Sequence, residues 1–268
     1  TGGSRGIGAA AVRAFARAGF RAAFFYRADE AAAQTRRSGM IELESWLKAY
    51  ADRMEAAFGE RLVLLGLQGS YRRGEATEES DIDLEAVLNR VDVEELRQYR
   101  ALIREMPEGE KACGFIAGQE ELRNWPRWDL YQLAGDVRVL RGRAEAVFPA
   151  FTAADARQAA REGAAALYHA ACHSFLYGEA SGGALAELYK GTFFVLRAAH
   201  DARAGYRAVS RRDLLPRLEG DDREILAACI GRKAFLGADR AALDEGYRAL
   251  IRWCGKILRE CGGAVASV

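Results

Sequence analysis

Residues 69–85 are GSYRRGEATEESDIDLE, and the interpretation of the whole chain starts from this stretch. An apolar run at 62–67 comes before it and predicts a buried strand, and a second apolar run begins at Ile82. Because side chains alternate along a strand, Asp81 and Asp83 are expected on one face. Two carboxylates beside a Gly-Ser turn, where a phosphate can approach backbone N–H groups, favour a site for a Mg²⁺-bound triphosphate.

This pattern of Gly-Ser, spacer and Asp-x-Asp within a strand resembles the nucleotidyltransferase signature of the DNA polymerase β superfamily. Over about residues 40–260 the order of elements is similar to that of the bacterial aminoglycoside adenylyltransferases. The resemblance implies an α+β fold, with a small mixed nucleotidyltransferase sheet and flanking helices followed by a C-terminal helical bundle. The domain boundaries expected from it are 40–145 for the nucleotidyltransferase domain and 146–268 for the bundle.

The resemblance also implies roles for the residues of the motif. Asp81 and Asp83 would be catalytic residues that hold one or two Mg²⁺ ions, and Gly69 and Ser70 would cradle the β- and γ-phosphates. The substrates would be ATP, as donor of AMP, and a hydroxyl group on a small molecule or a protein.

Three basic residues are candidates for binding the nucleotide. Arg72 and Arg73 follow the Gly-Ser turn, where they either neutralise triphosphate charge or lie on the surface. Lys190, near the start of a predicted helix at 185–204, either reaches a phosphate, as a basic residue of the bundle does in the relatives, or is solvated.

Relatives of this kind carry a third acid on the neighbouring strand. The corresponding position falls at or near Cys113, in a predicted strand at 111–117 that contains no Asp or Glu. Glu85 is a candidate substitute as general base, because strand alternation puts it on the same face as Asp81 and Asp83. The alternative is that Glu85 faces solvent or pairs with an arginine, and that the protein binds nucleotide with little turnover.

Hydrophobic periodicity and capping residues predict the remaining elements. The predicted helices are 41–58, 92–104, 151–177, 185–204, 221–229 and 240–259, and a last edge strand is predicted at 137–142.

Two side-chain groups are ambiguous. His169 and His173, at i and i+4 of a helix, either pair on a metal or pack against a neighbouring helix, and packing is favoured because no third ligand is evident. Trp125 and Trp128 either form a wall for a ring-shaped substrate or pack in the core, and packing is again favoured.

The first residues contain a competing motif. Residues 1–8, TGGSRGIG, look like the cofactor loop of short-chain dehydrogenases, and the resemblance covers about residues 1–30. The strand that should precede this loop and the family's Tyr-x-x-x-Lys are both missing from the sequence. We therefore interpret residues 1–39 as a truncated dehydrogenase-like fragment fused ahead of a natural start at Met40.

The net charge and the cysteine content bear on the protein's partners and on its location in the cell. The net charge is +1, so no global field indicates nucleic acid or a membrane surface as a partner. Five cysteines, an odd number without a Cys-x-x-Cys pair, fit free thiols in a reducing compartment, and a cytoplasmic location is expected.

Three hypotheses for function follow. The first is a Mg²⁺-dependent nucleotidyltransferase that moves AMP from ATP to a hydroxyl acceptor. The second is a catalytically weak, nucleotide-binding or antitoxin-like protein of the same fold. The third, an NAD(P)-dependent dehydrogenase, rests on residues 1–30 alone and is the least favoured.

Overall fold

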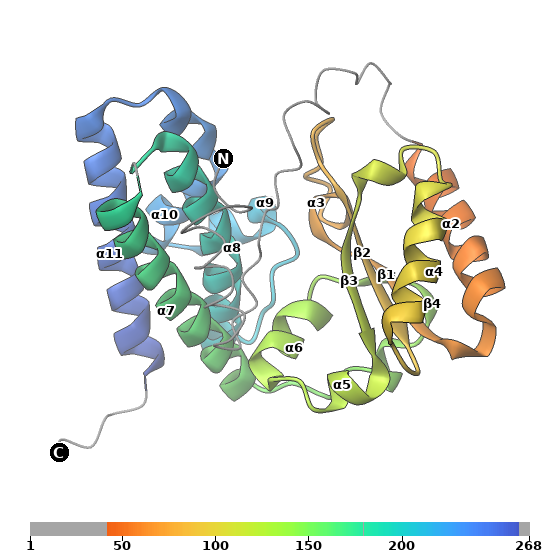
Figure 1. Ribbon diagram of the computed structural model, residues 1–268. Helices are drawn as coiled ribbons and strands as arrows, with labels where there is room; N and C mark the ends of the chain where they lie inside the picture. Colours follow the sequence, from red (N-terminus) through yellow and green to blue (C-terminus); the bar gives the residue numbers. More distant parts are fainter. Residues whose placement is uncertain (1–41, 179, 263–268) are drawn as a thin grey trace. The chain divides into compact units, whose positions relative to one another are not determined.

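Four strands form one mixed sheet in the order β3-β2-β1-β4 (Figure 1). Strand β1 is antiparallel to both of its neighbours, whereas β2 and β3 run parallel. The strands are β1 (Leu62–Leu67), β2 (Ile82–Leu88), β3 (Ala112–Gly118) and β4 (Arg138–Gly142). The structure is a computed structural model that describes residues 42–178 and 180–262, and the predicted dehydrogenase fragment lies outside these residues.

Helices make up most of the rest of the described chain. They are α2 (Leu43–Phe58), α3 (Gly69–Arg72), α4 (Val93–Arg104), α5 (Gln119–Arg123), α6 (Arg127–Ala134), α7 (Ala153–Tyr177), α8 (Gly182–Ala204), α9 (Arg211–Leu214), α10 (Gly220–Ile230) and α11 (Arg240–Cys261). Short 3-10 helices lie at Gly59–Arg61, Gly109–Lys111, Ala144–Ala146, Leu215–Arg217 and Arg232–Gly237. The chain divides into two compact units, Thr1–Leu43 and Glu44–Val268. All of these elements belong to the second unit, except that the first residue of α2, Leu43, belongs to the first.

The strands form where the sequence predicted apolar runs. Leu64, Leu65 and Leu67 of β1 are almost completely buried, and so are the apolar residues of β2. Burying each such side chain stabilises the fold by roughly 1.5–3 kcal/mol relative to leaving it exposed. The central pair β1–β2 is therefore the most firmly held part of the sheet, and it carries the Gly-Ser turn and the acidic pair.

Helices α2 and α4 pack against each other through polar and aromatic contacts. The Tyr50 and Tyr99 hydroxyls lie 3.1 Å apart, and Gln98 donates to the carbonyl of Ala57 at 3.0 Å. Helix α4 begins with a complete capping box at Asp92, which satisfies two backbone N–H groups that a helix start leaves unpaired.

The C-terminal helices have a core of their own. Helices α7 and α8 pack closely along each other, and α10 and α11 join them. Thr152 caps α7 in a capping box with Asp155, which explains why the helix begins at Ala153. Tyr131 of α6 belongs to this helical core, so α6 links the sheet region to the helices.

The predicted fold class is confirmed. The sheet is small and mixed, helices flank it, and a helical region follows. Every predicted strand and helix named above is found, with ends that differ by a few residues. No helix in the described ranges combines the length and the apolar character that crossing a membrane requires. The boundaries proposed at 40 and 145 stay predictions.

Candidate nucleotide and metal site

The acidic pair lies where β2 begins. Asp81 precedes the strand and is exposed, whereas Asp83 lies within the strand and is partly buried. The backbone carbonyl of Asp83 accepts a hydrogen bond from the N–H of Gln68 at 2.7 Å, which fastens the end of β1 to β2. Two neighbouring strands thus bring the Gly-Ser turn and the acidic pair together.

Gly69 packs directly against the side chain of Asp83. Its φ is +70°, in the left-handed region that glycine adopts without steric cost. A Cβ at this position would lie 1.7 Å from Asp83 Oδ2 and 2.5 Å from its Cγ, so a larger residue would displace the carboxylate. The glycine of the motif therefore provides a close approach between the turn and Asp83.

The charges around Asp83 come from several elements. Burial raises the pKa of Asp83, the Arg73 and Lys190 charges lower it, and the Asp81 and Asp136 charges raise it further. A cation at Asp81 and Asp83 would offset this cost, and hard carboxylate oxygens are ligands that suit Mg²⁺. The pair therefore fits a metal of this kind, with water and phosphate oxygens as the remaining ligands.

Lys190 of α8 lies close enough to Asp83 for the two charges to interact. Burial lowers the pKa of Lys190, and the Glu187 and Asp83 carboxylates act in the opposite direction. The structure thus brings Lys190 to the acidic pair, as the phosphate-binding role would require, and it does not place the side chain in open solvent.

Glu85 is enclosed. It is fully buried, and its carboxylate accepts a hydrogen bond from Gln68 Nε2. Its neighbour across the sheet is Gly66 of β1. Glu85 therefore lies on the Asp83 face of β2 as predicted from alternation, but deeper in the molecule, and the amide of Gln68 is one of its partners.

The residues after Gly69 form a short helix and its C-terminal cap. Ser70 is partly buried, and its carbonyl accepts from the N–H of Glu75 at 2.8 Å. Arg72 has a buried Nε with no hydrogen-bond partner among the described residues. Arg73 is almost fully buried and makes ion pairs with Glu75 and Asp136. Its guanidinium thus has protein partners on both sides.

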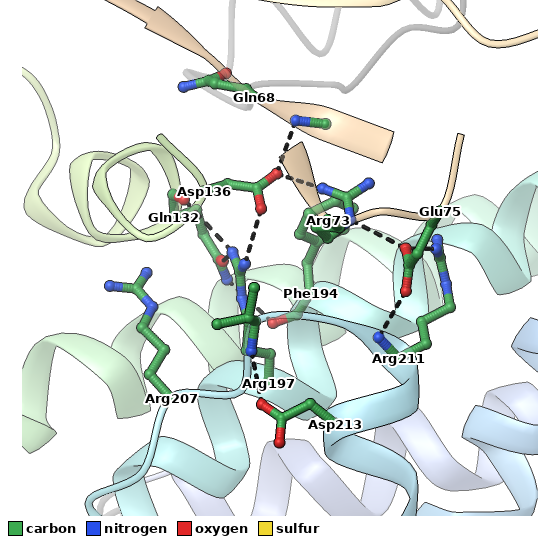
Figure 2. Close-up of polar contacts among 12 residues, drawn as sticks. Gln68, Arg73, Glu75, Gln132, Asp136, Phe194, Arg197, Arg207, Arg211 and Asp213 are labelled. Carbon is green, nitrogen blue, oxygen red and sulfur yellow. Dashed lines mark hydrogen bonds and ion pairs between the residues drawn. The ribbon is translucent and has the colours of Figure 1, made fainter. Parts of the chain in front are cut away.

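Asp136, between α6 and β4, is a site residue that the sequence did not reveal (Figure 2). Its Oδ2 accepts from the N–H of Gly69 at 3.1 Å and from Arg73 Nη1, and its Oδ1 accepts from Arg197 Nη1 at 3.4 Å. A lone Asp before an edge strand carries no pattern that predicts this. Arg197 could have been noticed, because it is a charge inside the apolar run 193–199.

Cys113, where the resemblance led us to expect a third acid, lies beside Asp83 in the sheet. Asp83 pairs with Cys113 across the parallel β2–β3 ladder, and β3 contains no acidic residue. Burial raises the pKa of the Cys113 thiol, and the Asp83 and Asp81 charges raise it further. A protonated thiol beside Asp83 is a poor Mg²⁺ ligand and a poor base toward a hydroxyl.

Of the other ambiguous groups, the two tryptophans pack in the cores, whereas the ring contact between the two histidines is within α7. The rings of His169 and His173 lie 6.1 Å apart along α7, and within residues 42–178 and 180–262 no set of three or more His, Cys, Asp or Glu side chains could hold a metal ion. Trp125 donates to Asp129 at 2.6 Å and packs with the core beneath the sheet, and Trp128 packs against the helical core.

Comparison with known proteins gives a family for part of the chain. Residues 47–140 match the family model of the nucleotidyltransferase domain. No curated protein sequence matches the chain. A solved structure, that of the spectinomycin adenyltransferase AAD(9) from Enterococcus faecialis with ATP and spectinomycin, is similar at a TM-score of 0.49 and 13% identity, over 81% of this chain and 99% of that one. The matched stretch 47–140 contains the Gly-Ser turn and the acidic pair, so this part of the protein is a nucleotidyltransferase domain and the protein is an enzyme of the nucleotidyltransferase type.

Proposed function

We propose that the protein is a Mg²⁺-dependent nucleotidyltransferase that transfers AMP from ATP to a hydroxyl group. The observation that carries the proposal is the contact between Gly69 and the Asp83 carboxylate inside a nucleotidyltransferase domain. A turn without a side chain lets the Asp83 carboxylate lie directly against the backbone, which supports a role of Asp83 as a metal ligand fixed beside the Gly-Ser turn.

Asp81 and Asp83 would hold the metal in this proposal. Mg²⁺ bound there would supply positive charge that offsets the charge of the phosphates and of the departing pyrophosphate. Lys190, whose charge interacts with that of Asp83, and Arg72, beside the Gly-Ser turn, are the basic groups proposed to meet the triphosphate. Arg73 is paired with Glu75 and Asp136. The N–H of Gly69 already donates to Asp136, so the steric role of Gly69 is the one that the geometry supports.

The reaction requires one bond to form and one to break. The acceptor hydroxyl oxygen bonds to the α-phosphorus, the bond from that phosphorus to the bridging oxygen breaks, and pyrophosphate leaves. The hydroxyl proton passes to a base, for which Glu85 remains the predicted candidate. Because Glu85 is buried, it would reach this proton through an intervening water molecule.

The acceptor proposed is a small-molecule or protein hydroxyl, and the proposed location is the cytoplasm. All five cysteines are free thiols, which fits a reducing compartment. Neither nucleic acid nor a membrane surface is indicated by the net charge of +1.

A second candidate function is nucleotide binding with little turnover. Two observations favour it: Cys113 pairs with Asp83 where an acid would serve the chemistry, and Glu85 is enclosed. Incubation with α-labelled ATP, Mg²⁺ and a panel of aminoglycosides and proteins separates the two candidates. Label transferred to an acceptor with release of pyrophosphate supports the enzyme. Tight, saturable binding of ATP without transfer of label to any acceptor of the panel supports the second candidate. Binding of NAD(P) in place of ATP would instead support the dehydrogenase hypothesis.

A further inference from the structure

A buried chain of alternating charges runs through the site (Figure 2). It consists, in order, of Arg197, Asp136, Arg73, Glu75 and Arg211, and each member forms an ion pair with the next. We call these five residues the charge chain. Its two ends belong to the C-terminal region, Arg197 in α8 and Arg211 in α9. Of the three residues between them, Arg73 and Glu75 follow the Gly-Ser turn, and Asp136 lies between α6 and β4.

The charge chain is enclosed by aromatic rings. The guanidinium carbons of Arg73, Arg197 and Arg211 lie 5.6, 5.4 and 5.1 Å from the centre of the Phe193 ring. Arg197 is fully buried, and burial lowers its pKa to about 10. Charges removed from water in this way depend on their partners, so removal of one carboxylate leaves a buried cation uncompensated.

Asp136 connects the charge chain to the backbone of the Gly-Ser turn. Its carboxylate accepts from two arginines and also from the N–H of Gly69, the residue in contact with Asp83. A single side chain thus fixes the turn relative to β4, to the cap of α3 and to α8.

We propose that Asp136 is a positioning residue for nucleotide binding, which holds the Gly69 turn against Asp83 and ties it to Arg197 of α8. This inference rests on the proposed function, since it assigns Asp136 to the same site. Without the Asp136 carboxylate, the turn loses its acceptor for the Gly69 N–H and Arg197 loses its charged partner. The phosphate-facing backbone then becomes mobile, and affinity for Mg²⁺-ATP falls.

Asp222 offers a matched control. It is another buried aspartate, which accepts from Arg203 Nη2 at 2.7 Å and from Trp253 Nε1 at 2.9 Å within the C-terminal helices. Asp136→Ala and Asp222→Ala each remove a buried carboxylate with one or more arginine partners, so both are expected to destabilise the fold. Only Asp136→Ala removes a contact to the Gly69 turn.

The test compares amide hydrogen exchange over residues 67–75 and binding of Mg²⁺-ATP in the full-length variants. We expect Asp136→Ala to accelerate exchange in this segment and to weaken Mg²⁺-ATP binding, each by about tenfold or more, because a fixed turn becomes locally mobile. We expect Asp222→Ala to change neither by more than about twofold, since its contacts lie elsewhere. If Asp136→Ala does not fold, the double variant Asp136→Ala/Arg197→Met removes both buried charges and is expected to fold and to show the same two effects.

Two results would overturn the proposal. One is exchange over residues 67–75 that is the same in Asp136→Ala as in Asp222→Ala. The other is faster exchange with Mg²⁺-ATP affinity equal to that of the unmodified protein. If the unmodified protein binds no nucleotide at all, the proposed function fails, and the exchange comparison alone then decides whether Asp136 holds the turn.

Discussion

Gly69 shows how one residue can define the site. Both its backbone conformation and the space around it exclude a side chain, because φ is +70° and the Asp83 carboxylate occupies the place of a Cβ. The two effects can be separated by comparison with a glycine that has the conformation without the contact. Gly205, at the end of α8, has φ +64° and nothing within 4 Å of its Cβ position.

We therefore expect Gly69→Ala to abolish Mg²⁺-dependent nucleotide binding, whereas Gly205→Ala leaves it unchanged. Strain in the left-handed region costs each variant about 1–2 kcal/mol in the free energy of unfolding, and the displaced carboxylate adds to the cost at Gly69. Chemical denaturation and ATP titration measure the two effects. Equal nucleotide affinity in the two variants would show that the contact with Asp83 has no role in binding.

Asp83 gives the site a predictable pH dependence. Its pKa in the folded protein is raised, chiefly by burial, so the folded state holds the proton more tightly than the unfolded state. Ionisation of Asp83 therefore lowers the free energy of unfolding. This loss of stability is absent below the ordinary aspartate pKa of about 4, and it grows as the pH rises from there through the raised pKa.

Asp83→Asn should accordingly raise the free energy of unfolding at pH 7 in the absence of divalent cations, with a benefit that shrinks as pH falls toward about 4. Urea denaturation across this pH range measures it. Asp155→Asn is the opposite case, because Arg127 lowers the pKa of Asp155, and this variant should lose stability at pH 7. An Asp83→Asn variant that is less stable than the unmodified protein at pH 7 would contradict the electrostatic description.

Glu85 can be tested as the base with little change of shape. Glu85→Gln removes the charge and leaves an amide beside Gln68. If Glu85 takes the acceptor proton, kcat should fall by ~10²-fold or more while nucleotide affinity stays within a small factor. Steady-state kinetics on the acceptor identified by labelling measure this. Full activity would exclude the role and direct the search to Glu110, Glu120 and Glu121.

Among the elements, strands β1 and β2 could be predicted from the sequence. The role of the segment between α6 and β4, which carries Asp136, could not. Apolar runs fix where a buried strand forms, and alternation then places Asp81, Asp83 and Glu85 on one face. How deeply a side chain is buried does not follow from alternation, because burial depends on which other elements pack against that face of the strand. Glu85 is therefore fully buried, although a position facing solvent was one of the alternatives that the sequence left open. Asp136 was missed for a related reason: its partners Gly69 and Arg197 lie far from it in sequence.

Strand β3 yields a prediction of increased activity. The register pairs Cys113 with Asp83. The resemblance to the adenylyltransferases led us to expect an acid at this position. If the missing acid limits turnover, Cys113→Glu should raise Mg²⁺-dependent transfer by about tenfold or more, whereas Cys113→Ser should leave it unchanged. Pyrophosphate release at saturating ATP measures both. Equal rates in the two variants would show that the chemistry does not lack an acid at this position.

At the scale of the whole molecule, the sheet and the C-terminal helices share one site. Asp83 comes from β2, Lys190 and Arg197 come from α8, and Asp136 lies between α6 and β4. The order of sheet and then helices was readable from the sequence, since it follows from local periodicity. The ion pairs that join the two regions were not, because pairing between distant charges leaves no local pattern.

The segment before Met40 should be dispensable for this site. Every residue assigned to the site lies in the unit Glu44–Val268. We expect a chain that begins at Met40 to fold with a similar melting temperature and to bind nucleotide as well as the full chain does. Thermal denaturation and ATP titration of the two chains make the comparison. Loss of folding in the shorter chain would show that the preceding residues are integral, and would refute the proposed boundary.

The central claim, that Asp81 and Asp83 beside Gly69 form a Mg²⁺-nucleotide site, is tested most directly by calorimetric titration with a non-hydrolysable α,β-methylene analogue of ATP. This measurement needs no knowledge of the acceptor. The account predicts binding of one analogue per chain that requires Mg²⁺ and weakens by about tenfold or more in Asp83→Asn, because the metal loses a charged ligand. Binding that is independent of Mg²⁺, or that Asp83→Asn leaves unchanged, would contradict it.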